Sequence, residues 1–295
     1  MPVVAEKPMT NGKVLVSGSD GRIGQATVAE LREHGYDVTP ADIRRRAAWN
    51  TQIVDFTDLD QVIGVMQGHD AAVHLAAIPS PEAHTNEVVF SNNVVSTFNV
   101  LEAATILGIN TVVMASSISA LGYAYRHRYF HPQYVPVDEA HPLLSQDSYG
   151  LSKMIGETLA AGFLRRSPDM ALISLRFTLV VDESAREWMR PARDNPPDSE
   201  ATFGAFWTFV DLRDAASACR LALENARPGH EAYLINAPHI YRREDIRDLL
   251  AAHYPGEYPI AKHVRGSASP VDPGKAQRQL SWSARYNWDG ELIER

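Results

Sequence analysis

The sequence predicts an α/β protein with a Rossmann-type, doubly wound parallel sheet, and three observations support this. Apolar strand-like runs alternate with helix-like runs, the first strand is followed by a glycine-rich loop and a helix, and Tyr149 and Lys153 lie four residues apart on a later helix. Alternating elements with mostly apolar strands are typical of a parallel sheet covered on both faces. A ligand of such a sheet is expected at the carboxyl ends of the strands, where the strand order reverses.

The elements follow one another in regular order. Strand-like runs rich in aliphatic residues are 14–17, 37–41, 51–54, 71–75, 111–115, 171–176 and 232–235. Runs with helical periodicity are 25–33, 59–66, 88–107 and 148–164. Two regions break the alternation: 181–199 is rich in proline and charge, and 241–295 is irregular apart from a helix-like run at 243–252.

The loop after the first strand reads Gly18-Ser19-Asp20-Gly21-Arg22-Ile23-Gly24. A strand, a glycine loop and a helix in this order are the context in which a glycine pattern indicates dinucleotide binding. The glycines allow a tight turn and let the backbone approach a pyrophosphate at the helix N-terminus. An ordinary turn is the alternative interpretation of this loop.

Tyr149 and Lys153 share a helix face if 148–164 is helical. An ammonium beside a phenol favours the phenolate, by about 3 kcal/mol at roughly 5 Å and an effective dielectric near 20. We therefore expect the Tyr149 pKa to lie on the order of two units below its ordinary value of about 10, which suits an acid/base near neutral pH. A surface helix with a stacked pair is the alternative.

These motifs and the upstream Ser117 resemble the short-chain dehydrogenase/reductase superfamily, and most closely its extended branch of NAD-dependent epimerases and dehydratases. The resemblance runs from Lys13 to about Trp288 and includes four further segments: 70–77, 93–103, 209–216 and 275–282. It implies a small C-terminal substrate lobe beside the Rossmann sheet. We therefore expect a loose tail at 1–12, a dinucleotide-binding domain at 13–178 and 207–237, and a substrate lobe at 179–206 and 238–295.

The resemblance also implies NAD as the cofactor. Asp42 follows the second strand, where a carboxylate accepts hydrogen bonds from ribose hydroxyls and repels a 2′-phosphate, which favours NAD over NADP. Arg44 would favour the opposite choice if it paired with a phosphate. Asp55 and Phe56 match a pair beside the adenine, or else begin a helix cap. The residues expected at the cofactor are Gly18, Gly21, Arg22, Ile23, Gly24, Asp42, Asp55, Phe56, Leu75, Ala76, Ala77, Asn93, Tyr149 and Lys153.

By the same resemblance, Tyr149 is the general acid/base, Lys153 tunes it and holds the nicotinamide ribose, and Ser117 hydrogen-bonds the reacting oxygen. Ser116 is the rival serine. Asn93 matches an asparagine that holds a water relay near the lysine, with a packing amide as its alternative. The expected substrate contacts are Ser80, Ser117, Ile118, Ser119, Tyr149 and Arg176. A structural salt bridge is the alternative for Arg176.

The expected reaction class follows from the positions at which this sequence differs from other members of the family that it resembles. Dehydration is disfavoured, because Ile118-Ser119 replaces the Asp-Glu pair of the dehydratases. The segment 176–209 is short for a nucleotide clamp, so the plan is closer to uronate dehydrogenase and related sugar dehydrogenases. We expect an NAD-dependent dehydrogenase/reductase that acts on a sugar or a small polyol-like alcohol or carbonyl. A sugar or nucleotide-sugar epimerase with tightly bound NAD and a non-catalytic dinucleotide sensor are the alternatives.

Composition bounds the partners and the location. The net charge is −8 and no basic stripe is interleaved with aromatic residues, so we expect no nucleic-acid binding. No apolar run approaches the roughly 20 residues of a membrane span, and residues 1–11 lack the apolar core of a signal peptide. The single cysteine, Cys219, fits a reducing cytoplasm, and no metal site is expected.

Two expectations concern surfaces. The family pairs the helix after Asn93 with the helix that carries Tyr149, which implies a homodimer. Residues that would supply the apolar surface are Val94, Val95, Phe98, Leu101, Met154, Ile155 and Leu159. The loop 123–134 is expected to face the substrate, or else to form a surface flap.

Overall fold

The computed structural model describes residues 11–44, 49–194 and 206–293. Its centre is a seven-stranded parallel sheet in the order β3-β2-β1-β4-β5-β6-β9. The strands are β1 (Lys13–Ser17), β2 (Asp37–Asp42), β3 (Gln52–Ile53), β4 (Ala71–His74), β5 (Thr111–Ser117), β6 (Ala171–Phe177) and β9 (Gly229–Ile235). The predicted doubly wound α/β fold is confirmed. Most of the predicted tail, residues 1–10, lies outside the described residues.

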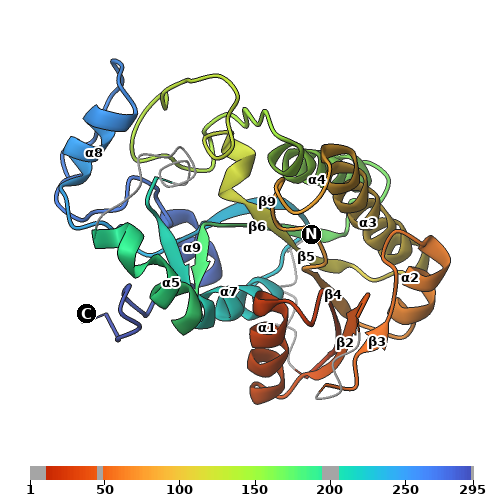
Figure 1. Ribbon diagram of the computed structural model, residues 1–295. Helices are drawn as coiled ribbons and strands as arrows, with labels where there is room; N and C mark the ends of the chain where they lie inside the picture. The colour runs from red at the N-terminus through yellow and green to blue at the C-terminus, as the bar shows by residue number, and fades with distance from the viewer. Residues whose placement is uncertain (1–10, 45–48, 195–205, 294–295) are drawn as a thin grey trace, which may run out of the picture.

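Helices cover both faces of the sheet (Figure 1). One face carries α1 (Arg22–Glu33), α7 (Leu212–Glu224) and α9 (Gly274–Leu280). The other carries α2 (Leu59–Met66), α3 (Asn86–Leu107) and α4 (Ser148–Leu164). A two-stranded parallel sheet of β7 (Leu179–Val181) and β8 (Phe209–Asp211), with α5 (Glu183–Asp194) and α8 (Ile246–His253), lies beyond the carboxyl end of the main sheet.

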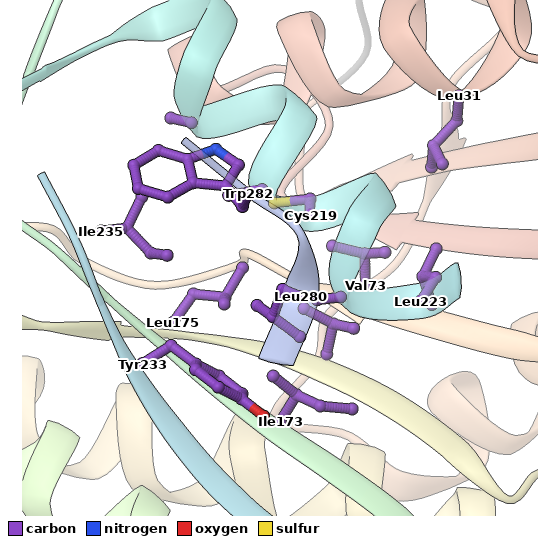
Figure 2. Packing of buried hydrophobic residues seen from close by; sticks show 14 of the residues in the cluster. Leu31, Val73, Ile173, Leu175, Cys219, Leu223, Tyr233, Ile235, Leu280 and Trp282 are labelled. Atoms are coloured by element: carbon purple, nitrogen blue, oxygen red, sulfur yellow. The ribbon is translucent and has the colours of Figure 1, made fainter. Parts of the chain in front are cut away.

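The strands bury side chains on both faces, which explains their continuous apolar sequences. In β1, Val14 and Val16 face the cluster under α1, α7 and α9, whereas Leu15 faces the cluster under α3 and α4. Figure 2 shows the first cluster, where Leu280 and Trp282 pack beside Cys219 of α7. Each such buried side chain contributes about 1.5–3 kcal/mol to folding.

A third apolar cluster lies outside the main sheet, and we call it the lobe cluster. It joins the segment after β5 to the small sheet and to residues of the C-terminal region. Its larger aromatic members are Tyr123, Phe206, Trp207, Phe209, Tyr241, Tyr254 and Trp288. The loop 123–134 is packed onto this region, since Tyr123 is fully buried and the Tyr129 hydroxyl donates to the Pro255 carbonyl at 2.7 Å.

The limits of the predicted substrate lobe remain a prediction. The lobe cluster draws on residues of 179–206 and 238–295, as expected, but also on Ile118–Val137 within the predicted dinucleotide-binding domain. Conversely, Leu280 and Trp282 pack against the main sheet. Residues of the lobe cluster and residues that pack against the main sheet therefore alternate along the sequence.

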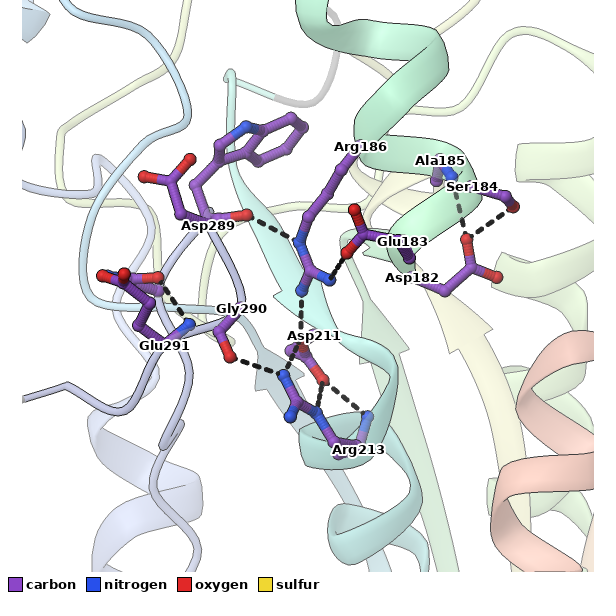
Figure 3. A network of polar contacts seen from close by, with 12 residues as sticks. Asp182, Glu183, Ser184, Ala185, Arg186, Asp211, Arg213, Asp289, Gly290 and Glu291 are labelled. Carbon is purple, nitrogen blue, oxygen red and sulfur yellow. Dashed lines mark hydrogen bonds and ion pairs between the residues drawn. The ribbon is translucent and has the colours of Figure 1, made fainter.

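A network of buried charges attaches the small sheet to helix α7. Asp211, at the end of β8, accepts a hydrogen bond from the Arg213 backbone N–H at 2.9 Å and caps α7. Its carboxylate also binds the guanidinium groups of Arg186 and Arg213 (Figure 3). Because Arg186 Nε donates to the Trp288 carbonyl at 2.6 Å, the network also holds the C-terminal segment.

Candidate active site

The segments that follow β1 and β4 meet at the carboxyl edge, where the strand order reverses. Gly18 has φ +65°, and a Cβ there would lie 2.6 Å from the Ala76 nitrogen, so only glycine fits this approach. The Ser17 hydroxyl accepts hydrogen bonds from the backbone N–H groups of Leu75 and Ala76 at 3.0 and 3.2 Å. Two of the predicted cofactor segments are thereby brought together.

The glycine loop leads directly into α1. Gly21 is the N-cap residue and supplies no side-chain cap, and the first turn of α1 has no acidic residue. A Cβ on Gly24 would lie 2.1 Å from the Gly18 carbonyl oxygen, so the helix can approach the loop only with glycine there. The N–H groups of this first turn can therefore receive an anionic phosphate. Arg22, also in the loop, forms an ion pair with Asp182 at 3.7 Å.

Asp42 lies at the end of β2, next to the glycine loop. Its carboxylate accepts hydrogen bonds from the backbone N–H groups of Asp20 at 3.0 Å and of Arg44 at 3.2 Å. Both bonds come from backbone groups and fix the orientation of the carboxylate. Arg45 and Arg46 lie outside the described residues.

The Asp55–Phe56 pair divides into two environments. Asp55 accepts hydrogen bonds from the backbone and hydroxyl of Thr57 at 2.9 and 2.7 Å, while Asp58 is the cap of α2. The Phe56 ring is buried in the cluster under α3 and α4, 6.0 Å from the His74 ring centroid. The Phe56 ring is part of the core, and the expected contact of the Asp55–Phe56 pair with the adenine stays a prediction.

The first turn of α4 places Tyr149 against Ser117. Asp147 caps this helix by accepting hydrogen bonds from the backbone N–H groups of Tyr149 and Gly150, both at 2.9 Å. A Cβ on Gly150 would lie 2.6 Å from the Ser119 carbonyl oxygen, so glycine lets the helix approach the chain just after β5. The Ser117 hydroxyl lies close enough to the Tyr149 phenol to lower its pKa, so the structure brings these two predicted site residues together.

The Lys153 ammonium donates to the Ala115 carbonyl at 2.8 Å and lies 5.6 Å from the centroid of the Tyr149 ring. Burial lowers the pKa of Lys153 to about 8. Burial also raises the pKa of Tyr149 to about 12, and the nearby Ser117 hydroxyl only partly opposes this. The expected lowering of the Tyr149 pKa is thus wrong for the protein alone, because both groups lose hydration and the ammonium is bonded to a carbonyl oxygen.

Ser116 and Arg176 are both bonded to a residue that the sequence analysis did not select. Ser116 donates to Glu157 Oε1 at 2.7 Å, and Arg176 binds both carboxylate oxygens of Glu157 at 2.9 and 2.7 Å. The structure thus shows the salt bridge that was the alternative for Arg176, and a substrate contact of Arg176 stays a prediction. Glu157 follows Lys153 by one helical turn, which was the available sequence signal.

Asn93 is a brace between two segments of the site. Its side-chain amide donates to the Ile78 carbonyl at 3.0 Å and to the Ser152 hydroxyl at 3.1 Å, and its oxygen accepts from the Ile78 N–H at 2.8 Å. These bonds correspond to the packing amide, and the expected water relay near Lys153 stays a prediction.

The remaining expected substrate contacts differ in exposure. Ser80 is partly exposed in the loop after β4 and accepts a hydrogen bond from the Glu82 N–H at 3.1 Å. Ser119 is buried, and its N–H donates to the Ser117 hydroxyl at 3.1 Å. Ile118 is buried in the lobe cluster. The expected substrate contact of Ile118 stays a prediction, and its buried side chain leaves mainly backbone atoms for such a contact.

The described residues contain neither a membrane-spanning helix nor a metal-binding cluster. In residues 11–44, 49–194 and 206–293, no helix is long and apolar enough to cross a membrane. Over the same part of the chain, no group of three or more histidine, cysteine, aspartate or glutamate side chains is arranged to hold a metal ion.

Comparison with known proteins gives the family. A model described as "NAD dependent epimerase/dehydratase family" matches residues 14–236. An L-arabinose 1-dehydrogenase (NAD(P)(+)) of Haloferax volcanii is 32% identical over 223 residues, spanning 73% of this chain and 84% of that protein. A uronate dehydrogenase of Pseudomonas syringae pv. tomato is 28% identical over 159 residues, spanning 52% of this chain and 54% of that one.

A solved structure shows the same fold. A short-chain dehydrogenase/reductase superfamily protein from Agrobacterium tumefaciens, crystallised with NAD, has a TM-score of 0.69 and 24% identity, and the match covers 94% of each chain. The family match extends from β1 to the residue after β9 and includes the glycine loop, Ser117, Tyr149 and Lys153. The chain therefore belongs to the NAD-dependent epimerase/dehydratase family and is an NAD(P)-dependent enzyme.

Proposed function

We propose that this protein is an NAD-dependent dehydrogenase that oxidises a free sugar or a small polyol-like alcohol, or reduces the corresponding carbonyl. The observation that carries the proposal is the contact between Ser117 and Tyr149, with the Lys153 ammonium beside the phenol ring. The similarity to an arabinose dehydrogenase and a uronate dehydrogenase supports a free sugar as the substrate.

The residues of the carboxyl edge fit a dinucleotide. Gly18 and Gly24 let the loop lie against the turn after β4 and against α1, which leaves the N–H groups of the first turn of α1 for phosphates, and the Asp42 carboxylate is fixed next to this loop. Gly18–Gly24 would hold the phosphates, Asp42 the adenosine ribose, and Lys153 the nicotinamide ribose. When bound, the nicotinamide supplies the hydride acceptor or donor.

The protein's own part in the reaction is to orient the substrate and move a proton. Ser117 would hold the reacting oxygen of the substrate, and Tyr149 would take or return the proton of that hydroxyl. The Lys153 ammonium, 5.6 Å from the phenol ring, stabilises the phenolate once the site is closed to water. Asn93 and Gly150 would act by position, since they fix the loop after β4 and the first turn of α4.

The test is a screen of aldoses, uronates and polyols, with L-arabinose first, in which NADH formation is followed. Tyr149→Phe removes one hydroxyl, so turnover on the best substrate should fall by about 10²- to 10⁴-fold. NAD affinity should barely change, because the phosphates contact the glycine loop. Near wild-type turnover of this variant would show that Tyr149 is not the acid/base.

The same screen separates the alternatives. An epimerase would convert a sugar or nucleotide sugar into its epimer without net NADH, which product analysis by NMR detects. A sensor would bind NAD without converting any of the compounds. The Ser117–Tyr149 contact favours an enzyme over a sensor. The relatives include UDP-glucose 4-epimerases as well as an arabinose and a uronate dehydrogenase. We propose the dehydrogenase because the segment 176–209 is short for a nucleotide clamp.

We further propose that the protein is a homodimer and is located in the cytoplasm. The exposed apolar residues of α3 are Val88, Phe90, Val95, Phe98 and Ile106. Several recur at helical spacing on one stripe, which is the kind of surface that a symmetric partner covers. Cys219 is buried without a disulfide, which is compatible with a reducing compartment.

A further inference from the structure

We propose that Glu157 and Arg176 are positioning residues for the active site, which hold α4 in register against β5 and keep the net charge behind Lys153 at zero. This inference rests on the proposed function, since it concerns the same Tyr149–Lys153 pair. It assigns a role to two residues that contact neither the reacting oxygen nor the cofactor segments described above.

Three consecutive residues of β5 each hold one turn of α4. Ser117 lies against the Tyr149 phenol, the Ala115 carbonyl accepts from Lys153 at 2.8 Å, and Ser116 donates to Glu157 at 2.7 Å. Tyr149, Lys153 and Glu157 are four residues apart in sequence, so they share a helix face. A shift of α4 by one turn would break all three contacts together.

The Glu157 contact is the strongest of the three. Arg176 binds the Glu157 carboxylate through Nε and Nη2 at 2.9 and 2.7 Å, and the two residues are 4% and 7% exposed. Arg176 lies directly opposite Ser116 in the pairing of β5 with β6. The ion pair therefore connects α4 to two neighbouring strands at the level of the catalytic groups, through a bidentate geometry that lysine cannot reproduce.

The pair also controls the charge around Lys153. Titratable groups near Lys153 and Tyr149 include His74 on β4, Asp147 at the α4 cap and Tyr125. Those near the Glu157–Arg176 pair include His230 on β9 and Glu139. Burial and the Lys153 charge keep the pKa of His74 at about 3, so this ring is neutral at pH 7. With both members present, Glu157 and Arg176 cancel. Removing either one leaves a buried charge beside Lys153, and the sign depends on which one is removed.

Opposite charges give opposite shifts. In Glu157→Gln the remaining Arg176 cation disfavours the Lys153 ammonium, so the Lys153 pKa should fall. In Arg176→Met the remaining Glu157 anion favours the ammonium, so the pKa should rise. A unit charge at roughly 10 Å and an effective dielectric near 20 corresponds to about one pKa unit in each case. The double variant should return to within a few tenths of a unit of the wild-type value.

The pKa of Lys153 can be measured by NMR on the whole protein with ¹³C-labelled lysine, where Lys153→Met assigns the signal. This readout needs no substrate, so it decides the inference even if the proposed reaction is wrong. The double variant has no unpaired buried charge and is expected to fold even if a single variant does not. The charge argument would be overturned if the Lys153 pKa moved in the same direction in both single variants. It would also be overturned if the Lys153 pKa of the double variant equalled that of a single variant.

A second arm tests position apart from charge. Arg176→Lys keeps the charge but loses the bidentate contact, so the Lys153 pKa should stay near the wild-type value while kcat falls about tenfold. The KM for the sugar and the Kd for NAD should change little, because the Arg176 guanidinium is buried against Glu157. Unchanged kcat in Arg176→Lys would show that the pair does not position the site. A wild-type protein without any turnover would refute the proposed function and leave the NMR result standing.

Discussion

Lys153 and Glu157 are both buried, but they differ in how far their charges are compensated by partners. Lys153 is 9% exposed and its ammonium has one hydrogen bond in the structure, to a carbonyl oxygen. Glu157, one helical turn further along, is matched by a bidentate arginine. Burial therefore shifts the pKa of Lys153 strongly, to about 8, whereas Glu157 has its charge compensated. The burial of an uncompensated ammonium destabilises the folded protein, which is typical of a residue retained for function rather than for stability.

Lys153→Met should stabilise the protein while it removes activity. The folded pKa of about 8 lies below the unfolded value of 10.5, so at pH 7 the folded chain carries a disfavoured charge. Replacing it should raise the free energy of unfolding by about 1–3 kcal/mol in denaturant titrations at pH 7. The gain should shrink as the pH rises from 8 towards 10.5, because the wild-type lysine then loses its proton on folding. Lys262→Met, at an exposed position, is the control and should change stability by less than about 0.5 kcal/mol.

Asp42 should govern the choice of cofactor. Its carboxylate is fixed by two backbone N–H groups, so Asp42→Asn removes the charge with little change in shape. We expect wild type to bind NAD more tightly than NADP, and the variant to lose about tenfold or more of this preference, in calorimetric titrations with both cofactors. Asp37→Asn, at the exposed opposite end of β2, should leave the preference unchanged. Equal binding of both cofactors by wild type would mean that Asp42 does not read the ribose.

Elements are positioned at this site by close backbone approaches. The glycine loop can lie against the turn after β4, and α1 against the loop, only because Gly18 and Gly24 have no Cβ. In the same way Gly150 lets α4 approach the chain after Ser117. These contacts convert three short sequence motifs into one edge of the sheet where cofactor and catalytic segments meet.

Gly24→Ala should abolish dinucleotide binding. Its Cβ would lie 2.1 Å from the Gly18 carbonyl oxygen, so loop or helix must move. We expect the Kd for NAD in calorimetry to rise by at least about 100-fold and stability to fall by roughly 1–3 kcal/mol. The control is Gly64→Ala in the middle of α2, where no atom lies within 4 Å of the added Cβ. That change should leave NAD binding intact and stabilise the helix by up to about 1 kcal/mol.

At the scale of the whole molecule, the outer surface of α3 exposes several large apolar side chains to solvent. Phe98 is 41% exposed and packs edge-on against Phe163 of the same chain. Leu101, which the sequence analysis grouped with it, is fully buried in the cluster under α3 and α4. One side of α3 is therefore buried in the core. The other side exposes a stripe of valine, phenylalanine and isoleucine side chains, which the proposed partner would cover.

Phe98→Glu should convert the proposed dimer into a monomer. A charge buried at a symmetric interface occurs twice and is unpaired in both copies, so association should weaken by several kcal/mol. Light scattering at micromolar concentration should give a dimer mass for wild type and a monomer mass for the variant. Ser91→Glu, at an exposed position on the same helix without an apolar side chain, is a milder comparison. A monomer mass for wild type would refute the homodimer.

The sequence by itself determined the fold and the location of the chemistry. Alternating apolar runs specify strands buried on both faces, and the observed order of the sheet follows from their right-handed connections. The helix bounds 59–66 and 148–164 agree with α2 and α4 because periodicity and caps are local properties. The motifs at Gly18–Gly24 and Tyr149–Lys153 could be placed for the same reason, since their spacing lies within one turn or one loop.

The tertiary structure alone decided which polar side chains are bonded to one another and which are buried. Arg176 and Glu157 are 19 residues apart on different elements, so nothing local in the sequence pairs them. The environment of Lys153 likewise depends on β5 and α4 together, and burial reversed the expected direction of the Tyr149 pKa. Hydration and partner distances arise only when distant segments pack, which is why the sequence located the reacting groups but could not set their charge states.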